Sequence, residues 1–382
     1  MIDRGELQFR NVDIVTPSSR IHLPYANVKG EDGWNSYKDF IRQVDIDGEL
    51  YAEQITTDDV AHFAPRLLPW RLTATDVRAE VSGRVADLNV DIGSMSFGQN
   101  SRLTGDVRLR GLPDAKRGRM TLDINRLATN SADVAELLTA ITGVKLSDKA
   151  LAIARQAGDM VLAGEFDGGF KAFTGNVTLT TSAGVAALTA EKQPVAVEKG
   201  ESPIAEIKAH ADLRHIALDR LLGSKALGSA TAEADFAGRI SEGNLRGDVS
   251  GRVESIELNG ARYENVVMRG SVNNKSFTGR ISDEGNPIAF DIVGLASFNG
   301  RVPLYDFTLD VKRADLAAMN INKRDSVSLL SLRADVYASG HNLDDMNGRV
   351  AINDGQYIYN ADTLHSSVVE LTADSGEARR KL

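Results

Sequence analysis

Apolar and polar residues alternate along most of this 382-residue chain. In the segments Arg119–Ile124, Ile288–Ile292 and Tyr305–Val311, apolar side chains occupy every second position, and Thr, Asp or other polar residues stand between most of them. Successive side chains of a β-strand point to opposite faces, so this alternation predicts strands with one apolar face. Short turns rich in Asn, Asp, Ser and Gly separate the segments. We predict an all-β protein, built as an elongated, curled antiparallel β-sheet that forms a groove (a β-taco).

A glycine lies at the centre of many of these segments, in the order apolar, any residue, Gly, any residue, apolar. The alternation places this glycine on the same face as its apolar neighbours, where it is expected to leave a notch and let the sheet curl around a trough. The other reading is that the glycines mark turns between strands. The motif occurs as IDGEL (46–50), VSGRV (81–85), LTGDV (103–107), LAGEF (162–166), FTGNV (173–177), FAGRI (236–240), LRGDV (245–249), MRGSV (268–272), FTGRI (277–281), FNGRV (298–302) and MNGRV (346–350).

The segments repeat loosely. ADFAGRISEGNLRGDV (234–249) and ADVYASGHNLDDMNGRV (334–350) match end to end with one extra residue in the second. Repeated hairpins of this kind predict an array in which each unit buries its apolar face only with its neighbours. A closed β-helix is ranked second, because its coils would have a steadier length than these segments show.

Helical signals are concentrated in one stretch. Ser131 is predicted to cap a helix over 133–141 that ends at Gly143, and Ser147 to cap a helix over 148–157 that ends at Gly158. Both helices are amphipathic, and Leu137, Leu138 and Ile141 share one face of the first. The insertion is expected either to cover the sheet or to act as a lateral gate that admits lipid.

Other helical signals are weaker. Segments 56–63 and 213–223 are predicted to add a helical turn or two, and the charged stretch 189–203 is predicted to be a mobile loop or the edge of a lid. The chain is therefore divided into a β-groove segment over 1–130, a helical insertion over 131–158 and a β-groove segment over 159–382 that continues the same sheet.

Composition narrows the class of protein. Hydrophobic residues make up 42% and charged residues 25%, enough apolar surface to offset the entropy of ordering the chain. There is no Cys, which excludes disulfides and thiolate chemistry. The 44 basic and 53 acidic residues give a net charge of −9 and are interspersed, so we predict no nucleic-acid partner.

No run of apolar residues is long enough to span a bilayer, and the first residues lack the apolar core of a signal peptide. We expect the chain to be a piece of a longer protein whose membrane anchor lies elsewhere.

The sequence predicts no catalytic residue, no cofactor and no metal site. No nucleotide-binding, zinc-protease or serine-hydrolase motif is present. His210 and His215 are five residues apart, a separation that puts them on opposite faces of a strand and argues against a shared metal. His341 lies with Asp344 and Asp345 in a segment whose Gly and Asn content predicts a turn.

Two further clusters are assigned structural roles. Asp58 and Asp59 precede a predicted helical turn, where carboxylates commonly cap free amides. Trp34, Tyr37 and Phe40 are predicted to form an amphipathic turn that covers the end of the sheet, rather than a cluster that stacks on a sugar.

The amount of one-sided apolar strand exceeds what these few helices can cover. An apolar face of this size is not stable in water unless it is buried or is a binding surface. Either two sheets close on each other as a sandwich, or one sheet folds lengthwise and leaves a trough for an apolar ligand.

The order of the segments resembles TamB of Gram-negative envelopes, within the wider AsmA-like group of bridge-type lipid-transfer proteins. The similar segments are 55–67, 72–90, 102–114, 120–138, 160–184, 301–321 and 335–357, and together with their surroundings they cover most of the chain. The resemblance implies a non-enzymatic periplasmic protein, anchored in the inner membrane, whose groove carries phospholipid toward the outer membrane. It also implies an outer-membrane barrel partner, contacted through regions not evident here.

The in-phase apolar residues are the predicted groove lining for the acyl chains. They are Leu103, Val107, Leu109, Leu122, Ile124, Phe277, Ile281, Phe290, Ile292, Phe307, Leu309 and Val311. An alternative is a scaffold that assists outer-membrane protein assembly or secretion by β-augmentation, which needs only open strand edges. A glycan-active β-helix is the third hypothesis, because such an enzyme would need carboxylates clustered on one face and the sequence pattern shows no such cluster.

Overall fold

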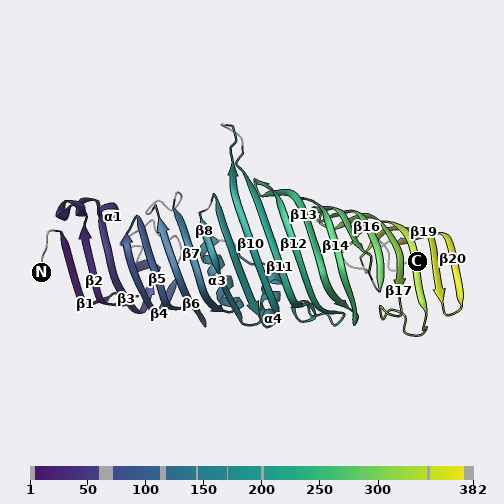
Figure 1. The fold of residues 1–382 in the computed structure, drawn as a ribbon, viewed down its shortest axis with the longest axis horizontal. Coiled ribbons are helices and arrows are strands. Elements are labelled where there is room, and N and C mark those ends of the chain that lie inside the picture. Colours follow the sequence, from purple (N-terminus) through teal and green to yellow (C-terminus); the bar gives the residue numbers. More distant parts are fainter. Residues whose placement is uncertain are drawn as a thin grey trace. The chain divides into compact units, whose positions relative to one another are not determined.

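The computed structural model describes residues 5–373 except 60–71, 112–117, 143–144, 170, 199–201, 286 and 342–344. The described residues form twenty β-strands and a few short helices (Figure 1). They divide into two compact units, Met1–Glu191 and Lys192–Leu382. The predicted fold class is confirmed: the protein is all-β, its strands are antiparallel, and within each unit the sheet is curled and not closed.

Unit 1 is an antiparallel meander in which each strand from β1 to β8 pairs with the next one in sequence. The helical insertion lies inside this unit, between β7 and β8. The strands are β1 (Glu6–Val15), β2 (Arg20–Gly30), β3 (Val44–Thr56), β4 (Thr73–Arg84), β5 (Asp87–Phe97), β6 (Ser101–Arg110), β7 (Arg119–Thr129), β8 (Met160–Gly168) and β9 (Phe173–Thr181), followed by β10 (Gly184–Val195), which crosses into the second unit.

Unit 2 repeats this architecture, and each strand from β11 to β19 pairs with its successor. Its strands are β11 (Ile204–Ala217), β12 (Leu227–Ser241), β13 (Asn244–Leu258), β14 (Ala261–Asn273), β15 (Ser276–Asp283), β16 (Ile288–Ser297), β17 (Leu304–Asp315), β18 (Ser328–Ser339), β19 (Asn347–Tyr359) and β20 (Asp362–Ala373). Within each unit, then, the described strands form one meander rather than the two packed sheets of a sandwich.

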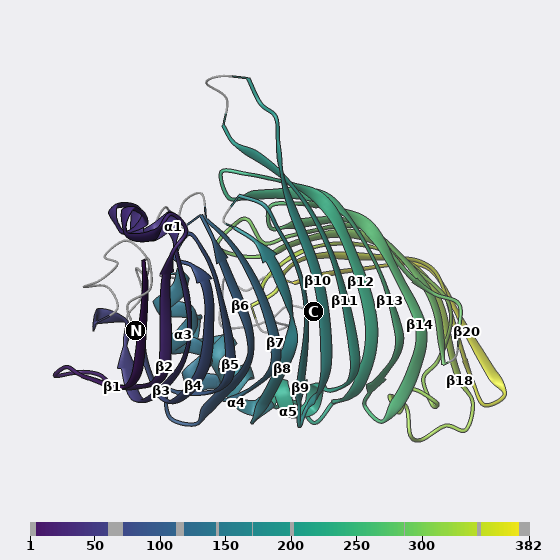
Figure 2. The same cartoon turned by 60° about the vertical axis from the view of Figure 1, so that its left-hand side comes forward.

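The helical insertion is confirmed, with one correction at its start. Helices α3 (Ser131–Thr142) and α4 (Asp148–Ala157) lie over one face of the sheet of unit 1 (Figure 2). Ser147 caps α4 by accepting a hydrogen bond from Ala150 N at 3.2 Å, and α4 ends at Gly158, whose φ is 77°. Ser131 does not cap α3: Asn130 does, because its Oδ1 accepts from the amides of Ala132 and Asp133.

Three weaker predictions have mixed outcomes. The segment 213–223 contains only the short helix α5 (Leu218–Leu222), since β11 extends to Ala217. The stretch 189–203 was predicted to be a mobile loop or the edge of a lid, but β10 continues through it to Val195. In the segment 56–63, residues 57–59 are helical, and residues 60–63 lie outside the described residues.

Among the described residues, fully buried apolar side chains are few. In unit 2, one cluster joins Ala261, Tyr263, Val311, Ala314 and Met319. In unit 1, a smaller cluster joins Ala52, Val77 and Ala79. The cluster of unit 2 lies near one end of its strands, and most other apolar side chains along the strands are only partly buried.

Candidate functional site: an apolar face in each unit

Apolar side chains of unit 1 form rows that run across the strands. The pairing register places Val81, Val90, Val107, Leu122 and Phe166 directly opposite one another, one from each of β4 to β8. Cross-strand neighbours of this kind lie about 5 Å apart, close enough for continuous contact. All five are partly exposed, so the row is a surface and not a sealed core.

Unit 2 carries a longer row of the same kind across seven strands. The row consists of Met268, Ile281, Ile292, Leu309, Ala334, Ile352 and Val369, one from each of β14 to β20. No side chain in this row has an oxygen or nitrogen atom, and its one heteroatom, the thioether sulfur of Met268, is only a weak acceptor. Except for Ala334, which is buried, its members are partly exposed or exposed.

The predicted lining residues fall into one set in each unit. In unit 1, Val107 lies opposite Leu122, and Leu109, Leu103 and Ile124 extend the same face. All five are partly exposed.

In unit 2, Ile281, Ile292 and Leu309 are direct neighbours on β15, β16 and β17. Phe277, Phe290 and Phe307 stand in phase with them on the same three strands, and all six are partly exposed. Val311 differs, because it is 7% exposed and packs in the cluster with Met319. It belongs to the core, which the alternation pattern alone could not distinguish from an open face.

The central glycines lie within strands, as predicted, in every motif except FNGRV. Gly300 of that motif falls in the turn between β16 and β17, with Phe298 and Val302 about half exposed. The glycines do not leave empty notches, however. A Cβ atom on Gly279 would lie 2.3 Å from the carbonyl oxygen of Arg269 and 2.7 Å from the ring of Phe277. The same ring would lie 2.6 Å from a Cβ on Gly270.

Aromatic rings cover three of these glycines, an arrangement known to stabilise glycine positions in sheets. Phe277 covers the directly paired Gly270 and Gly279, and Phe236 lies against Gly238. The glycines allow close approach of neighbouring backbones. The result is a smoother apolar wall than the sequence suggested.

A buried carboxylate fastens the helical insertion to the sheet. Asp133 of α3 is 2% exposed and accepts hydrogen bonds from the amides of Gln99 and Asn100 at 2.9 and 3.1 Å. It also accepts from Ser101 Oγ at 2.7 Å and Asn130 Nδ2 at 2.9 Å. Burial opposes ionisation, but these hydrogen bonds outweigh it and hold the pKa of Asp133 below its usual value of 3.8.

The other end of the insertion is fixed by the turn between β9 and β10. Ser182 Oγ donates to the carbonyl of Ala157, the last residue of α4, at 3.0 Å. Between the two fixed ends, Leu138 and Ile153 are about 40% exposed. The side chain of Ile141, predicted to share the face of Leu138, lies outside the described residues. The sequence contained no signal for the Asp133 contacts, because they involve a turn more than thirty residues away.

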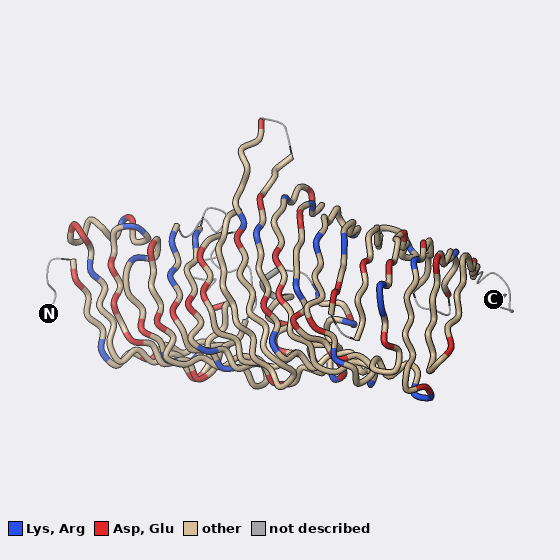
Figure 3. Tube along the Cα trace, turned by 45° about the vertical axis from the view of Figure 1, so that its right-hand side comes forward, with Lys and Arg blue, Asp and Glu red and all other residues tan. Residues whose placement is uncertain are grey.

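The opposite face of unit 1 is polar and carries a row of carboxylates (Figure 3). The register places Glu49, Glu80, Asp91, Asp106, Asp123 and Glu165 directly opposite one another on β3 to β8. Like charges in such positions repel each other. Flanking ion pairs partly offset this: Arg108 binds Asp87 at 2.8 Å, and Arg119 binds Asp167 through both carboxylate oxygens.

The remaining candidate residues have structural contacts. His210 pairs with Asp235 at 2.8 Å, whereas His215 lies at a bulge with a φ of 51°. His341 pairs with Asp345 at 3.0 Å, and Asp344 lies outside the described residues. Within the described part of the chain, no group of three or more His, Asp or Glu side chains could hold a metal ion.

Asp59 binds the hydroxyls of Thr16 and Ser19, joining the end of β3 to the turn between β1 and β2. Asp58 lies beside it in the same helical turn.

The aromatic cluster lies in the 3-10 helix η1 (Gly33–Asp39) and the following helix α1 (Phe40–Gln43). Tyr37 packs against Trp34 and Phe40 and donates its hydroxyl to the carbonyls of Gly5 and Val28. These bonds seat the cluster on the end of the β1–β2 hairpin.

None of the described helices is both long and apolar enough to cross a bilayer. The chain matches no family model, no curated protein and no solved structure.

Proposed function

We propose that this chain binds phospholipid acyl chains on its apolar faces and conducts lipid between the inner and outer membranes, without covalent chemistry. The observation that carries the proposal is the breadth of partly exposed apolar surface, which crosses seven strands in unit 2 with no polar side chain in its central row. The resemblance to TamB and the AsmA-like group supports the choice of phospholipid as the ligand and the periplasmic location.

The energetics suit conduction rather than tight binding. Each CH₂ group of an acyl chain removed from water contributes about 0.8 kcal/mol, so partial burial along a few strands is enough to hold a lipid. The rows are uniformly aliphatic or aromatic, so moving from one strand to the next changes the contacts little. A lipid on such a wall is held without being fixed in register.

Native mass spectrometry of the gently purified protein tests whether lipid is bound. We expect co-purified phospholipid that is lost after delipidation and regained from vesicles. Protein that stays lipid-free after incubation with vesicles would refute the proposal.

A matched pair of substitutions locates the bound lipid. Ile292 is partly exposed on the apolar face, and the next residue, Val293, is 51% exposed on the opposite face of β16. Ile292→Asp should abolish lipid recovery and transfer between vesicles, whereas Val293→Asp should leave both unchanged. Equal losses in both variants would place the lipid elsewhere or indicate general misfolding, which circular dichroism would reveal.

A second candidate is a scaffold for outer-membrane protein assembly or secretion through β-augmentation, with a barrel as partner. It is favoured by β20, which contacts β19 in the open sheet and has Val368 at 67% and Leu371 at 43% exposure. A backbone edge of this kind can accept another strand. Val368→Pro should impair strand addition and spare lipid binding, while Ile292→Asp should do the reverse.

A further inference from the structure

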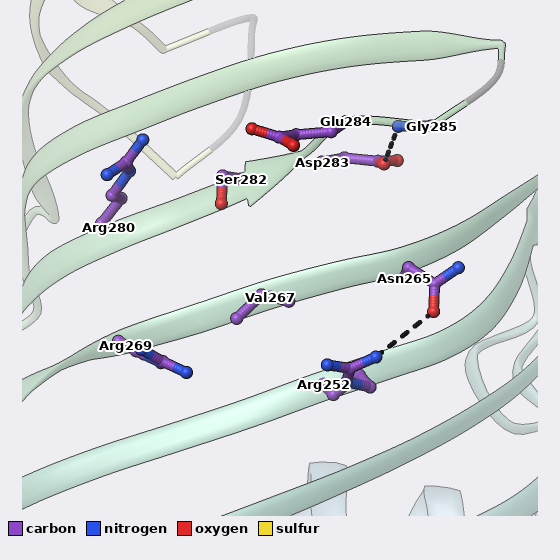
Figure 4. A pocket seen from close by; sticks show the side chains of 9 residues that line it. All are labelled: Arg252, Asn265, Val267, Arg269, Arg280, Ser282, Asp283, Glu284 and Gly285. Atoms are coloured by element: carbon purple, nitrogen blue, oxygen red, sulfur yellow. Dashed lines mark hydrogen bonds between the residues drawn. The ribbon is translucent and has the colours of Figure 1, made fainter.

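A hollow of about 560 Å³ lies on the polar face of unit 2, opposite the apolar rows (Figure 4). Arg252 of β13, Arg269 of β14 and Arg280 of β15 line it, with Val267 between them. Asp283, Glu284 and Gly285 close one end, where β15 finishes. Three guanidinium groups thus come from three adjacent strands onto one surface.

The register brings these positive charges together. Arg269 lies directly opposite Arg280, and Arg252 lies opposite Val267, two residues from Arg269 on the same face. Like charges placed opposite each other in a sheet are destabilising, so this grouping costs free energy unless something compensates it.

Compensation within the chain is incomplete. Arg280 is neutralised by Asp291, at 2.6 Å between Nε and Oδ1. Arg252 reaches only the neutral amide oxygen of Asn265, at 3.5 Å. Among the described residues, Arg269 forms no ion pair or side-chain hydrogen bond. Neither Arg252 nor Arg269 therefore forms an ion pair among the described residues, although Glu233 of β12 lies opposite Arg252 in the register.

The carboxylates at the end of the hollow are only partly engaged, because the buried Oδ2 of Asp283 has no hydrogen-bond partner among the described residues. Asp283 is 2% exposed and accepts from Gly285 N at 2.6 Å, and Glu284 lies 3.6 Å from Lys312 Nζ. An anion would therefore be favoured at the Arg252 and Arg269 side of the hollow.

We infer that Arg252 and Arg269 bind a phosphate-bearing group, a phosphate monoester or diester, on the polar face of unit 2. A guanidinium presents a planar fork of N–H donors that matches phosphate oxygens, and such charge-assisted bonds are stronger than neutral ones. The group could be a free phosphorylated molecule or the headgroup of a phospholipid. The inference does not rest on lipid conduction, because acyl chains are proposed to bind the other face.

Binding measurements with two probes test the inference and identify the source. Wild-type protein is titrated with glycerol 3-phosphate by calorimetry and with phosphatidylglycerol vesicles by flotation. Saturable binding of the first probe supports a free phosphate ester, and binding of the second supports a headgroup. For whichever probe binds, Arg269→Gln should weaken the affinity about tenfold or more.

Arg349→Gln is the matched control, because Arg349 lies in unit 2 but is already paired with Glu370 at 2.9 Å. Its affinity should equal that of the wild type. If neither probe saturates the wild type, or if Arg269→Gln and Arg349→Gln weaken binding equally, the inference is overturned.

Thermal unfolding separates a binding role from a structural one. In low salt without phosphate, Arg269→Gln should keep or raise the Tm, because it removes a repulsive neighbour of Arg280. Added phosphate should raise the Tm of the wild type and not that of the variant. A lower Tm for Arg269→Gln without phosphate would mean that Arg269 has a structural partner, and would overturn the inference.

Discussion

Replacing Asp133 by Asn should release the helical insertion from the sheet of unit 1. The carboxylate accepts four hydrogen bonds, three of them at Oδ2 from Asn100 N, Ser101 Oγ and Asn130 Nδ2. An Asn side chain has only one oxygen, so its NH₂ group would have to face the donors that bind one of the two carboxylate oxygens in the wild type. Hydrogen bonds to a charged acceptor contribute about 1.5–3 kcal/mol each. Losing the hydrogen bonds at one of the two carboxylate oxygens should therefore weaken the attachment of the insertion by about 3 kcal/mol.

Hydrogen exchange across α3 and α4 measures this loss directly. A cost of about 3 kcal/mol corresponds to a decrease in protection of about 100-fold for the amides of the insertion. Asp148→Asn is the control, since Asp148 is exposed in the first turn of α4 and should change stability by about 0.5 kcal/mol or less. Protection within threefold of the wild type in Asp133→Asn would refute the proposed role of the carboxylate.

The same carboxylate makes the attachment dependent on pH. Its folded pKa lies below the usual 3.8, so its contribution is complete above about pH 4 and is lost as the pH falls through the folded value. Asp133→Asn should remove this part of the pH dependence. If the insertion proves to gate lipid entry, as the sequence left open, the variant should also change transfer rates.

Two further predictions concern single contacts. Gly98→Ala should cost about 2 kcal/mol or more, because Gly98 has a φ of 59° and an added Cβ would lie 2.4 Å from the carboxylate carbon of Asp133. Gly93→Ala, where the nearest atom is 3.6 Å away, should cost less than half as much in denaturant unfolding. Arg119→Gln should raise the pKa of Asp167 from about 2 toward its usual 3.8, because the hydrogen bonds from Arg119 are the main cause of the lowered value. An NMR titration in which the Asp167 pKa stays near 2 would contradict this assignment.

Local sequence patterns fixed the type of most elements. The alternation in Ile288–Ile292 and Tyr305–Val311 was sufficient to predict β16 and β17, because a half-buried strand must place apolar side chains at every second position. Ser147 and Gly158 marked the ends of α4 for an equally local reason, since a capping acceptor favours a helix start and a glycine that can adopt positive φ favours a helix end.

The sequence also predicted which residues share a face, but not which of them meet. Ile281, Ile292 and Leu309 become neighbours only through the pairing register, which depends on turn lengths and bulges. One such bulge follows Val311, and the cluster around Met319 buries that residue although its pattern matches that of the open face.

Contacts between side chains on different elements were decided by the tertiary structure alone. The ring of Phe277 covers a glycine on the neighbouring strand, and Arg269 of β14 lies opposite Arg280 of β15. Asp133 accepts a hydrogen bond from a turn thirty-four residues away. Each contact depends on how two elements are placed against each other, by strand register or by docking of a helix, and no local propensity encodes that placement. The alternation of this chain therefore determined a curled sheet with one apolar face. Register and packing determined which parts of that face are open or covered, and where charged side chains gather on the opposite face.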